Sequence, residues 1–364
     1  MEQKKNDKLK DFDPNGIGVM GNGIYGLPFT QEDAKIILLG VPWDVTTSYH
    51  PGASEGPKAI LEASVQVELH KAKYPGFWKN GIAMVGAEKY NEYYGDMVAL
   101  NDELRVKAER YIAFLENGGK LADNEKMQDI LQGINTDCRD IHDAVENCVT
   151  AHLAQDKLVG LIGGDHSVSL GIIRALAKKH PEGFDILHID AHADLRKAYL
   201  SMEYSHASIM YNVSWIPQVE NIVQVGIRDV SEEEERFALS PEGKIVMLQW
   251  EKWMDKKFTK QTSWDNYCER ILCHLKSPKV YISFDIDGLR REDCPNTGTA
   301  VPGGLSYDEA IYLLNKIAEK KDIIGFDLVE VAPDPTQTND WDANVGARLV
   351  YHLCACMHHS QKNK

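Results

Sequence analysis

The sequence predicts an α/β protein built on a mostly parallel central sheet. The prediction rests on three nearly continuous apolar runs, rich in β-branched residues: LVGLIGG at 158–164, DILHID at 185–190 and VYISFD at 280–285. A strand needs such a run when both of its faces are buried, as in a parallel sheet covered by helices. Acidic or histidine residues follow each run directly, so we expect the carboxyl ends of these strands to be polar.

A helix is expected over residues 306–320. Ser306 and Glu309 have the spacing of a capping box, in which each residue satisfies a free backbone N–H of the first helical turn. The apolar positions that follow recur with the helical period and predict a buried stripe. This stripe comprises Ala310, Ile311, Leu313, Leu314, Ile317 and Ala318.

The chain is expected to form one domain with two additions. Residues 1–30 are polar and glycine-rich, which is typical of an N-terminal arm that either packs across a neighbouring subunit or is disordered. The single domain then covers residues 31–360. Within it, residues 86–135 contain a long helical pattern closed by glycine, so we expect a helical insertion there.

Polar residues that can bind metal ions follow the three apolar runs. The clusters are GGDHS at 163–167, DAHAD at 190–194 and DID at 285–287. Because the carboxyl ends of parallel strands meet at one edge of a sheet, these clusters should converge there. Side chains alternate along extended backbone, so alternate members of a cluster point the same way. The candidate ligands are His166, Asp190, His192, Asp194, Asp285 and Asp287.

Four carboxylates in one place predict a metal site. They would repel one another at pH 7 unless cations neutralised them, and a pair of divalent ions removes that conflict. Oxygen ligands with two imidazoles favour Mn²⁺, while Fe²⁺, Co²⁺ or Ni²⁺ are alternatives and Zn²⁺ is less favoured. Two nearby residues have simpler interpretations: Asp165 as a helix N-cap, and His188, one pleat deeper, as a core histidine.

The motifs resemble those of the ureohydrolases. GGDHS, DAHAD, SFDIDGL, TGTAVPGGLSYDEA and LVEVAP occur in the order and spacing found in arginase, agmatinase, guanidinobutyrase, formimidoylglutamase and guanidine hydrolase. The resemblance covers roughly residues 35–357. It implies a three-layer α/β/α arginase-like fold and two Mn²⁺ per subunit, bridged by a hydroxide that attacks a guanidinium group. It also implies a homo-oligomer, because trimers and hexamers are common in this family.

The resemblance assigns roles to individual residues. One metal ion would bind His166, Asp190, Asp194 and Asp285, and the other would bind Asp190, His192, Asp285 and Asp287. Glu330 matches the residue that receives the guanidinium group, and a carboxylate is the expected partner of such a planar cation. His206 matches the proton-handling histidine. Thr299 matches a position in the guanidinium pocket, although a turn role is an alternative.

Details of the motifs favour agmatine as the substrate, with release of urea and putrescine in polyamine metabolism. Arginases carry Asn and Asp at two positions that serve the α-amino-acid end of arginine. Here these positions hold Arg196 and Ser231, whereas DAHADLR followed by YSHAS looks more like agmatinase. Alternatives are arginase, guanidinobutyrase, guanidine hydrolase and formimidoylglutamase activity, in a pocket that Trp43, Thr47 or Trp341 could make smaller. A non-catalytic metal-binding regulator is the alternative of a different class.

Composition agrees with a cytoplasmic enzyme that acts on a small cation. The formal net charge of −15 argues against nucleic-acid binding and fits attraction of a cationic guanidino compound. No apolar stretch approaches the ~20 residues needed to cross a bilayer. Seven cysteines without zinc-type pairs indicate reduced thiols in a cytoplasm.

Overall fold

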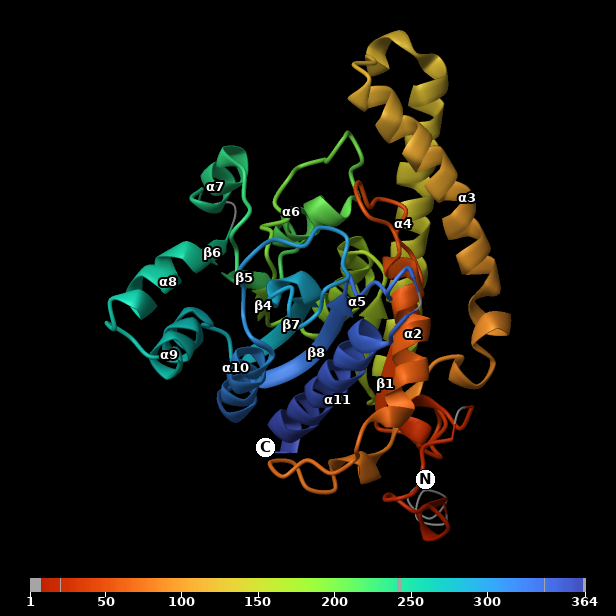
Figure 1. The fold of residues 1–364 in the computed structure, drawn as a ribbon, viewed down its shortest axis with the longest axis vertical. Coiled ribbons are helices and arrows are strands. Elements are labelled where there is room, and N and C mark those ends of the chain that lie inside the picture. The colour runs from red at the N-terminus through yellow and green to blue at the C-terminus, as the bar shows by residue number, and fades with distance from the viewer. Residues whose placement is uncertain (1–7, 20, 241–243, 337, 363–364) are drawn as a thin grey trace.

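A central parallel sheet organises the molecule, as a computed structural model shows (Figure 1). The structure describes residues 8–19, 21–240, 244–336 and 338–362. Within them, eight parallel strands lie in the order β2-β1-β3-β8-β7-β4-β5-β6. The strands are β1 (Ile36–Val41), β2 (Ile82–Met84), β3 (Leu158–Gly163), β4 (Phe184–Ile189), β5 (Val219–Val225), β6 (Ile245–Leu248), β7 (Lys279–Asp285) and β8 (Asp322–Val329). The described strands are all parallel, whereas the sequence predicted a mostly parallel sheet.

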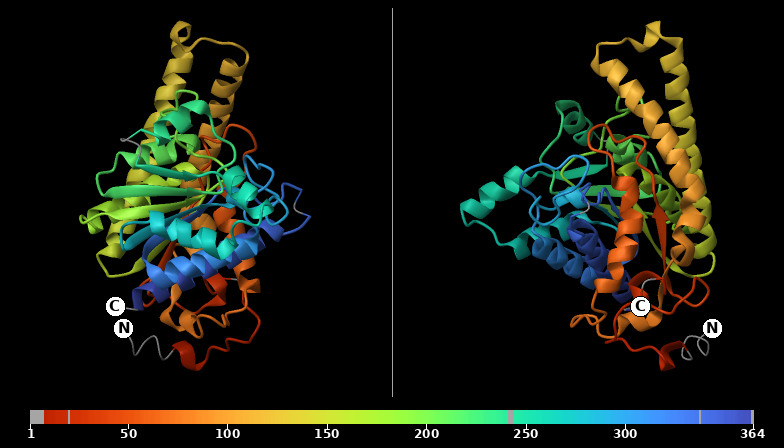
Figure 2. Two further views of the ribbon diagram at one scale, coloured as in Figure 1. Left: turned by 90° about the vertical axis from the view of Figure 1, so that its left-hand side faces the viewer. Right: turned by 45° about the vertical axis from the view of Figure 1, so that its right-hand side comes forward.

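Helices cover both faces of the sheet and make the three layers (Figure 2). One layer holds α2 (Gly56–Ala63), α9 (Trp264–His274), α10 (Tyr307–Lys320) and α11 (Trp341–Lys362), with α11 packed on β8 and β3. The other holds α3 (Tyr90–Glu116), α4 (Glu125–Leu153), α5 (Ser169–Lys179) and α6 (Ile209–Ser214). Two further helices, α7 (Glu232–Ala238) and α8 (Trp250–Phe258), lie beside β6. None of the described helices has the length and apolarity needed to cross a membrane.

The register of the sheet brings four carboxyl ends side by side. β8 and β7 lie between β3 and β4, so the chain leaves β3 and returns to a strand three places away. Residue pairs near the strand ends show the alignment: Ile162 is opposite Leu328, and Asp285 is opposite Val329. Residues that follow β3, β8, β7 and β4 therefore share one edge, and a change of chain direction at such an edge is where α/β sheets bind ligands.

Burial confirms the strands that the apolar runs predicted. Every residue of β1 and β4 is buried, and β3, β7 and β8 are buried except at their first residue. The predicted capping box of α10 is present, with the Glu309 N–H donating to Ser306 Oγ at 3.1 Å and the Ser306 N–H donating to Glu309 Oε2 at 2.9 Å. Its stripe is buried as expected, except that Ile311 is half-buried.

The first described residues pack against their own chain. The ring of Phe12 lies 5.5 Å from that of Trp78, and Tyr25 is buried with its hydroxyl donating to the carbonyl of Ala347 in α11. A backbone at positive φ places Tyr25 there (φ +60°). The part of the predicted arm from Ile24 to Phe29 thus belongs to the hydrophobic core.

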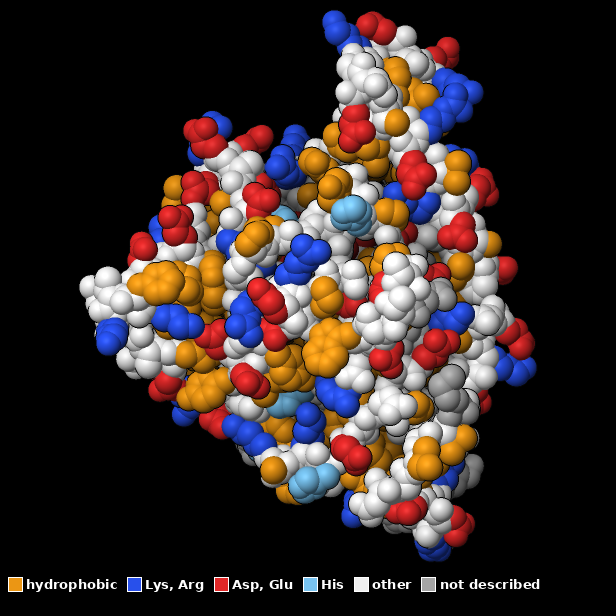
Figure 3. Space-filling view, viewed as in Figure 1, with side chains coloured by type: hydrophobic (Ala, Val, Ile, Leu, Met, Phe, Trp, Pro, Cys, Tyr) orange, Lys and Arg blue, Asp and Glu red, His pale blue; other side chains and the backbone are white. Residues whose placement is uncertain are grey.

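Helices α3 and α4 form a hairpin that extends beyond the sheet (Figures 1 and 2). Glycine ends α3 as predicted: Gly118 has φ +79°, and its N–H donates to the carbonyl of Leu115 at 2.9 Å. Asn124 then caps α4 by accepting from the Met127 N–H. Figure 3 shows acidic and basic side chains interspersed over the projecting end and over this face of the body.

Gly164 fits only as glycine, which yields a first prediction. A Cβ at this position would lie 1.9 Å from the carbonyl oxygen of Trp43, a backbone atom that cannot rotate away. We expect Gly164→Ala to lower the free energy of unfolding by about 1–3 kcal/mol, as overpacking typically does. Urea unfolding measures it. Gly133→Ala is the control: this site in α4 has no neighbour within 4 Å, so alanine should stabilise the protein slightly. An equal effect of both substitutions would contradict the prediction.

Candidate metal centre

The first half of the polar cluster surrounds one ring nitrogen of His166. Its Nδ1 lies 3.2 Å from Asp190 Oδ2, 3.1 Å from Asp194 Oδ2 and 3.3 Å from Asp285 Oδ2. His166 follows β3, Asp190 and Asp194 follow β4, and Asp285 ends β7; the sheet brings the carboxyl ends of these strands to one edge. All four side chains are buried. The structure thus assembles residues that are more than 100 positions apart in the sequence.

The second half surrounds His192. Its Nδ1 lies 3.0 Å from Asp287 Oδ2 and 3.5 Å from Asp190 Oδ1. The two oxygens of Asp190 therefore face the two histidines, one each. Potential ligand atoms of Asp190, His192 and Asp287 lie within 4.8 Å of one another, as do those of His166, His188, Asp190 and Asp194. All six residues predicted from the sequence are in this cluster, in two groups that share Asp190.

The electrostatics of the cluster fit divalent cations. Burial raises the pKa of Asp285 well above its usual value, and Asp287 and Asp190 raise it further. Burial and then Asp190 raise the pKa of Asp194 to about 6. Burial opposes ionisation of His192, but Asp287 and Asp190 outweigh it and raise its pKa to about 12. Without metal, protons on the histidines would partly balance the carboxylates, and metal binding would release them.

His166 Nδ1, the nitrogen at the centre of the first group, shows directly whether these residues fit a metal ion. His166 Nδ1 is buried and within 3.3 Å of three carboxylate oxygens, yet it has no hydrogen bond of good geometry. The three oxygens and the nitrogen converge on one space rather than pairing with each other. Imidazole nitrogen and carboxylate oxygen form a ligand set suited to Mn²⁺ and related ions. The residues present therefore fit a binuclear metal site.

A buried hydrogen-bond chain fixes the ring of His166. His166 Nε2 lies 2.9 Å from Ser283 Oγ, and the Ser283 hydroxyl donates to Asp327 at 2.9 Å. Tyr281 also donates to Asp327, at 2.7 Å. Because the serine proton goes to the carboxylate, Ser283 Oγ accepts from the His166 Nε2–H, and Nδ1 keeps its lone pair for a metal. The sequence analysis missed this chain, although Tyr281 and Ser283 share the strand parity of Asp285.

His188 supports Asp190 from behind. The sequence predicted a satisfied core histidine, and His188 is indeed buried with both ring nitrogens bonded. Its Nδ1 accepts from the Gln224 amide at 3.0 Å, so its Nε2–H donates to Asp190 Oδ2 at 2.7 Å. The same amide nitrogen donates to the carbonyl of Ala193. The carboxylate shared by both groups is thereby held in one orientation. Asp165 caps a 3₁₀ turn by accepting from the Ser167 N–H, as predicted.

The pocket beside the cluster contains the three other predicted site residues. It has a volume of about 190 Å³, and His206, Thr299 and Glu330 line it together with His166, Asp194 and Asp285. Glu330 directly follows β8, and its Oε1 accepts from the His166 N–H at 3.0 Å. Its backbone is left-handed (φ +62°), as is that of Asp194 (φ +54°), a costly conformation for these residues. Burial, and next Asp165, raise the pKa of Glu330 well above its usual value.

His206 starts a 3₁₀ turn in the loop after β4, capped by Ser205. Its ring Nδ1 lies 3.3 Å from Thr46 Oγ1, in the loop after β1. Burial, followed by the nearby His192 and His166, lowers the pKa of His206 to about 4. The imidazole is therefore neutral near pH 7.

The outer wall of the pocket differs from what the tryptophans suggested. Trp43 is buried in the core, and Trp341 is 51% exposed with its indole N–H donating to the carbonyl of Asp293. Neither lines the pocket, and Trp43 instead packs in the hydrophobic core. Arg196 does line it, and its guanidinium lies 5.1 Å from the ring centre of Tyr199. Ser231, also in the wall, caps α7 in a capping box with Glu234.

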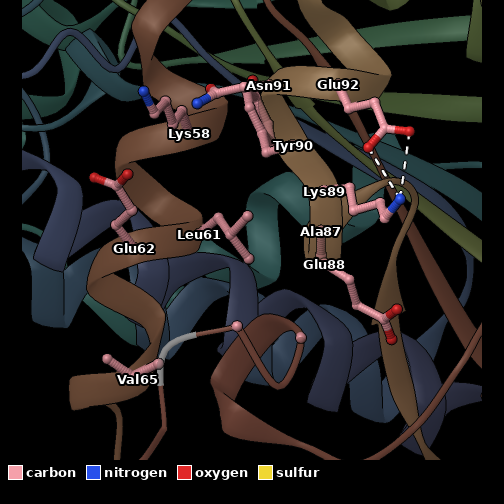
Figure 4. A pocket seen from close by; sticks show the side chains of 12 residues that line it. Lys58, Leu61, Glu62, Val65, Ala87, Glu88, Lys89, Tyr90, Asn91 and Glu92 are labelled. Carbon is pink, nitrogen blue, oxygen red and sulfur yellow. Dashed lines mark hydrogen bonds and ion pairs between the residues drawn. The ribbon is translucent and has the colours of Figure 1, made fainter.

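The pocket opens into a wider mouth. A cavity of about 900 Å³ shares His192, Asp229 and Thr299 with it and extends to Tyr49, Arg291 and Asp334. A separate cavity of about 350 Å³ lies between α2 and the start of α3 (Figure 4). The residues that line it include Lys89 and Glu92, which form an exposed ion pair that Figure 4 shows at one side. It lacks the buried carboxylates and histidines of the strand edge, which we therefore take as the functional site.

Comparison with known proteins agrees with this site. The family model "Arginase family" matches residues 34–356. An agmatinase of Bacillus cereus is 30% identical over 303 residues, which cover 83% of this chain and 85% of that protein. An N(1)-aminopropylagmatine ureohydrolase of Thermococcus kodakarensis is 30% identical over 326 residues, covering 90% of this chain and 92% of that protein.

Solved structures show the same fold. The agmatine ureohydrolase of Thermoplasma volcanium aligns with a TM-score of 0.67 at 24% identity, covering 98% of this chain and 99% of that one. Arginase from Medicago truncatula aligns with a TM-score of 0.63 at 23% identity, covering 89% and 87%. The three-layer α/β/α fold predicted from the motifs is thus confirmed. The chain belongs to the arginase family, whose ureohydrolases cleave linear amidines.

Proposed function

We propose that this protein hydrolyses the guanidinium group of agmatine, with release of urea and putrescine. The observation that carries the proposal is the convergence of Glu330, Thr299 and His206 on a small pocket whose inner wall is the carboxylate and histidine cluster. Relatives about 30% identical to this chain are agmatinases and N(1)-aminopropylagmatine ureohydrolases, which supports a substrate of this kind.

Each pocket residue has a part in the proposed reaction. Glu330 receives the guanidinium group, because a planar cation is bound best by a carboxylate in a water-poor site. Thr299, half-buried in the pocket wall, supplies a hydroxyl to the same group. His206, neutral and at the pocket wall, accepts a proton from water or passes one to the leaving amine.

The six ligands would hold two divalent ions, with Mn²⁺ as the proposed pair. His166, Asp190, Asp194 and Asp285 would hold one, and Asp190, His192, Asp285 and Asp287 the other. Such ions lower the pKa of water, so that a strong nucleophile is available at neutral pH for a carbon whose charge is delocalised. Asp190 is suited to bind both ions, because its two carboxylate oxygens face His166 and His192.

The test is urea or ammonium release by Mn²⁺-loaded and Ni²⁺-loaded protein. Agmatine, N(1)-aminopropylagmatine, L-arginine, 4-guanidinobutyrate, formimidoylglutamate and guanidine are assayed in parallel. We expect the highest kcat/KM with agmatine. Turnover of another compound without turnover of agmatine would contradict agmatine as the substrate but would still support hydrolysis of this type. Bound metal without any turnover would favour a non-catalytic metal-binding regulator.

A guanidino acid is the second candidate, favoured by one observation. Arg196 lines the pocket on Tyr199, with its Nε 3.9 Å from Glu234 Oε2. A guanidinium in the wall suits a carboxylate at the far end of the substrate, as in 4-guanidinobutyrate, better than the ammonium of agmatine. An Arg196→Gln variant separates the two: a lower kcat/KM for 4-guanidinobutyrate and a higher one for agmatine would support the guanidino acid.

We further propose that the protein acts in the cytoplasm in polyamine metabolism, as a trimer or hexamer. The polar residues 1–30 and the helical insertion at 86–135 are proposed additions to one ureohydrolase domain. Size-exclusion chromatography with light scattering measures the assembly. A monomer at micromolar concentration would contradict the proposed oligomer.

A further inference from the structure

Two loops that are distant in the sequence meet at Thr46. This residue lies after β1, is completely buried, and receives a hydrogen bond from the backbone N–H of His206 at 3.0 Å. The ring Nδ1 of His206 lies 3.3 Å from the same hydroxyl oxygen. Ser205 Oγ is slightly farther from that nitrogen, at 3.4 Å. One threonine hydroxyl therefore contacts both the backbone and the ring of the proton-handling histidine.

The direction of these hydrogen bonds follows from the partners of Asp165. The Thr46 hydroxyl lies 2.7 Å from Asp165 Oδ2, and the Thr46 N–H donates to the same oxygen at 3.2 Å. The other oxygen, Oδ1, accepts from the Ser167 N–H at 3.1 Å. Both carboxylate oxygens are thus acceptors, so the single hydroxyl proton of Thr46 goes to Asp165. Toward His206 the threonine oxygen can only accept.

We propose that Thr46 is a positioning residue that holds His206 as the Nδ1–H tautomer. Because Nδ1 donates to Thr46, the lone pair of the neutral ring is on Nε2, the nitrogen left for the pocket that His206 lines. The histidine is then prepared to accept a proton on the substrate side. The inference rests on the proposed function only in assuming that His206 transfers a proton.

Helix α3 holds the loop that carries Thr46. Arg105 is buried, and its Nη1 donates to the carbonyl oxygens of Asp44 and Val45 at 3.3 Å each and to that of Thr47. Asn101, one turn earlier, accepts from the Asp44 N–H at 2.8 Å. The same hairpin reaches the loop of His206, since the Tyr111 hydroxyl donates to the carbonyl of Leu200 at 2.9 Å. The α3–α4 hairpin thereby fixes both loops whose meeting positions the ring.

The test compares Thr46→Val with Thr46→Ser. Valine keeps the shape and removes the hydroxyl, so kcat on the preferred substrate should fall about 10-fold or more, within the range of general acid–base effects. KM should change less than kcat, and the metal content should stay at two ions per chain. Serine keeps the hydroxyl and should retain most of the wild-type kcat. Loss of metal in Thr46→Val, or failure of serine to restore kcat, would overturn the proposal.

A second measurement needs no substrate and no variant of Thr46. Nitrogen NMR of ¹⁵N-histidine-labelled, Zn²⁺-loaded protein reports which ring nitrogen of His206 carries the proton, with assignment by the signals lost in His206→Asn. We expect the proton on Nδ1. A proton on Nε2 would overturn the proposal even in an active enzyme. A proton on Nδ1 would support it even if agmatine were not the substrate, so the two proposals fail separately.

Discussion

Replacing Asp287 by alanine is expected to remove one bound metal ion and nearly all turnover, while the fold remains. Asp287 Oδ2 lies 3.0 Å from His192 Nδ1, and its Oδ1 accepts from the N–H of Ala191, the residue between the ligands Asp190 and His192. We expect kcat to fall at least about 10²-fold, because a two-metal site stabilises charge that one ion cannot. Metal analysis and urea release on the preferred substrate measure the two effects.

Stability separates this explanation from simple misfolding. Without metal, Asp287→Ala should stay folded with little change in stability, because the carboxylate repels the buried Asp285 as well as pairing with His192. With Mn²⁺ added, the wild type should gain more stability than the variant, which binds fewer ions. Asp96→Ala, at an exposed position of α3, is the control and should change neither the stability without metal nor the stability gained on adding Mn²⁺. A variant that keeps two metal ions and the full rate would contradict the ligand assignment.

Glu330→Gln is expected to weaken substrate handling while leaving the metal ions bound. Glutamine keeps the shape and the oxygen that accepts from the His166 N–H, so the backbone beside the metal ligand stays in place. It removes the negative charge that would pair with the guanidinium. Losing a hydrogen bond to a charged group costs about 1.5–3 kcal/mol, so kcat/KM should fall about 10- to 100-fold.

Glu55→Gln is the matched control for this change. Glu55 is an exposed glutamate at the mouth of the pocket, and the same loss of charge there should alter kcat/KM only slightly. Metal content is measured for both variants. Loss of a metal ion in Glu330→Gln would show that Glu330 belongs to the metal site rather than to the substrate.

The fold and the position of the cluster could be predicted from the sequence because both depend on local pattern. A strand buried on both faces requires an apolar run, and residues directly after such strands must share one edge of a parallel sheet. The apolar runs of β3, β4 and β7 therefore predicted that the candidate ligands gather at one edge of the sheet, as the structure shows. Ser306 and Glu309 likewise predicted the start of α10 from spacing alone.

The contacts that orient the site could not be predicted in the same way. Asp327 reaches Ser283 only because β8 lies beside β7, and Gln224 reaches His188 only because β5 lies beside β4. Thr46 meets His206 where two loops converge, at a separation of 160 residues. Tyr25 is another contact that spacing did not reveal: within the polar, glycine-rich residues 1–30 it has a positive φ, and its ring is buried in the core. Such contacts depend on strand order and loop paths, which residue spacing does not encode.

Anomalous diffraction from crystals of the Mn²⁺-loaded protein tests the central claim most directly, because it locates metal ions without any assumption about the substrate. Two peaks are predicted, one among His166, Asp190, Asp194 and Asp285, and the other among Asp190, His192, Asp285 and Asp287. A single peak at saturating Mn²⁺, or peaks away from these side chains, would contradict a binuclear centre at this edge of the sheet.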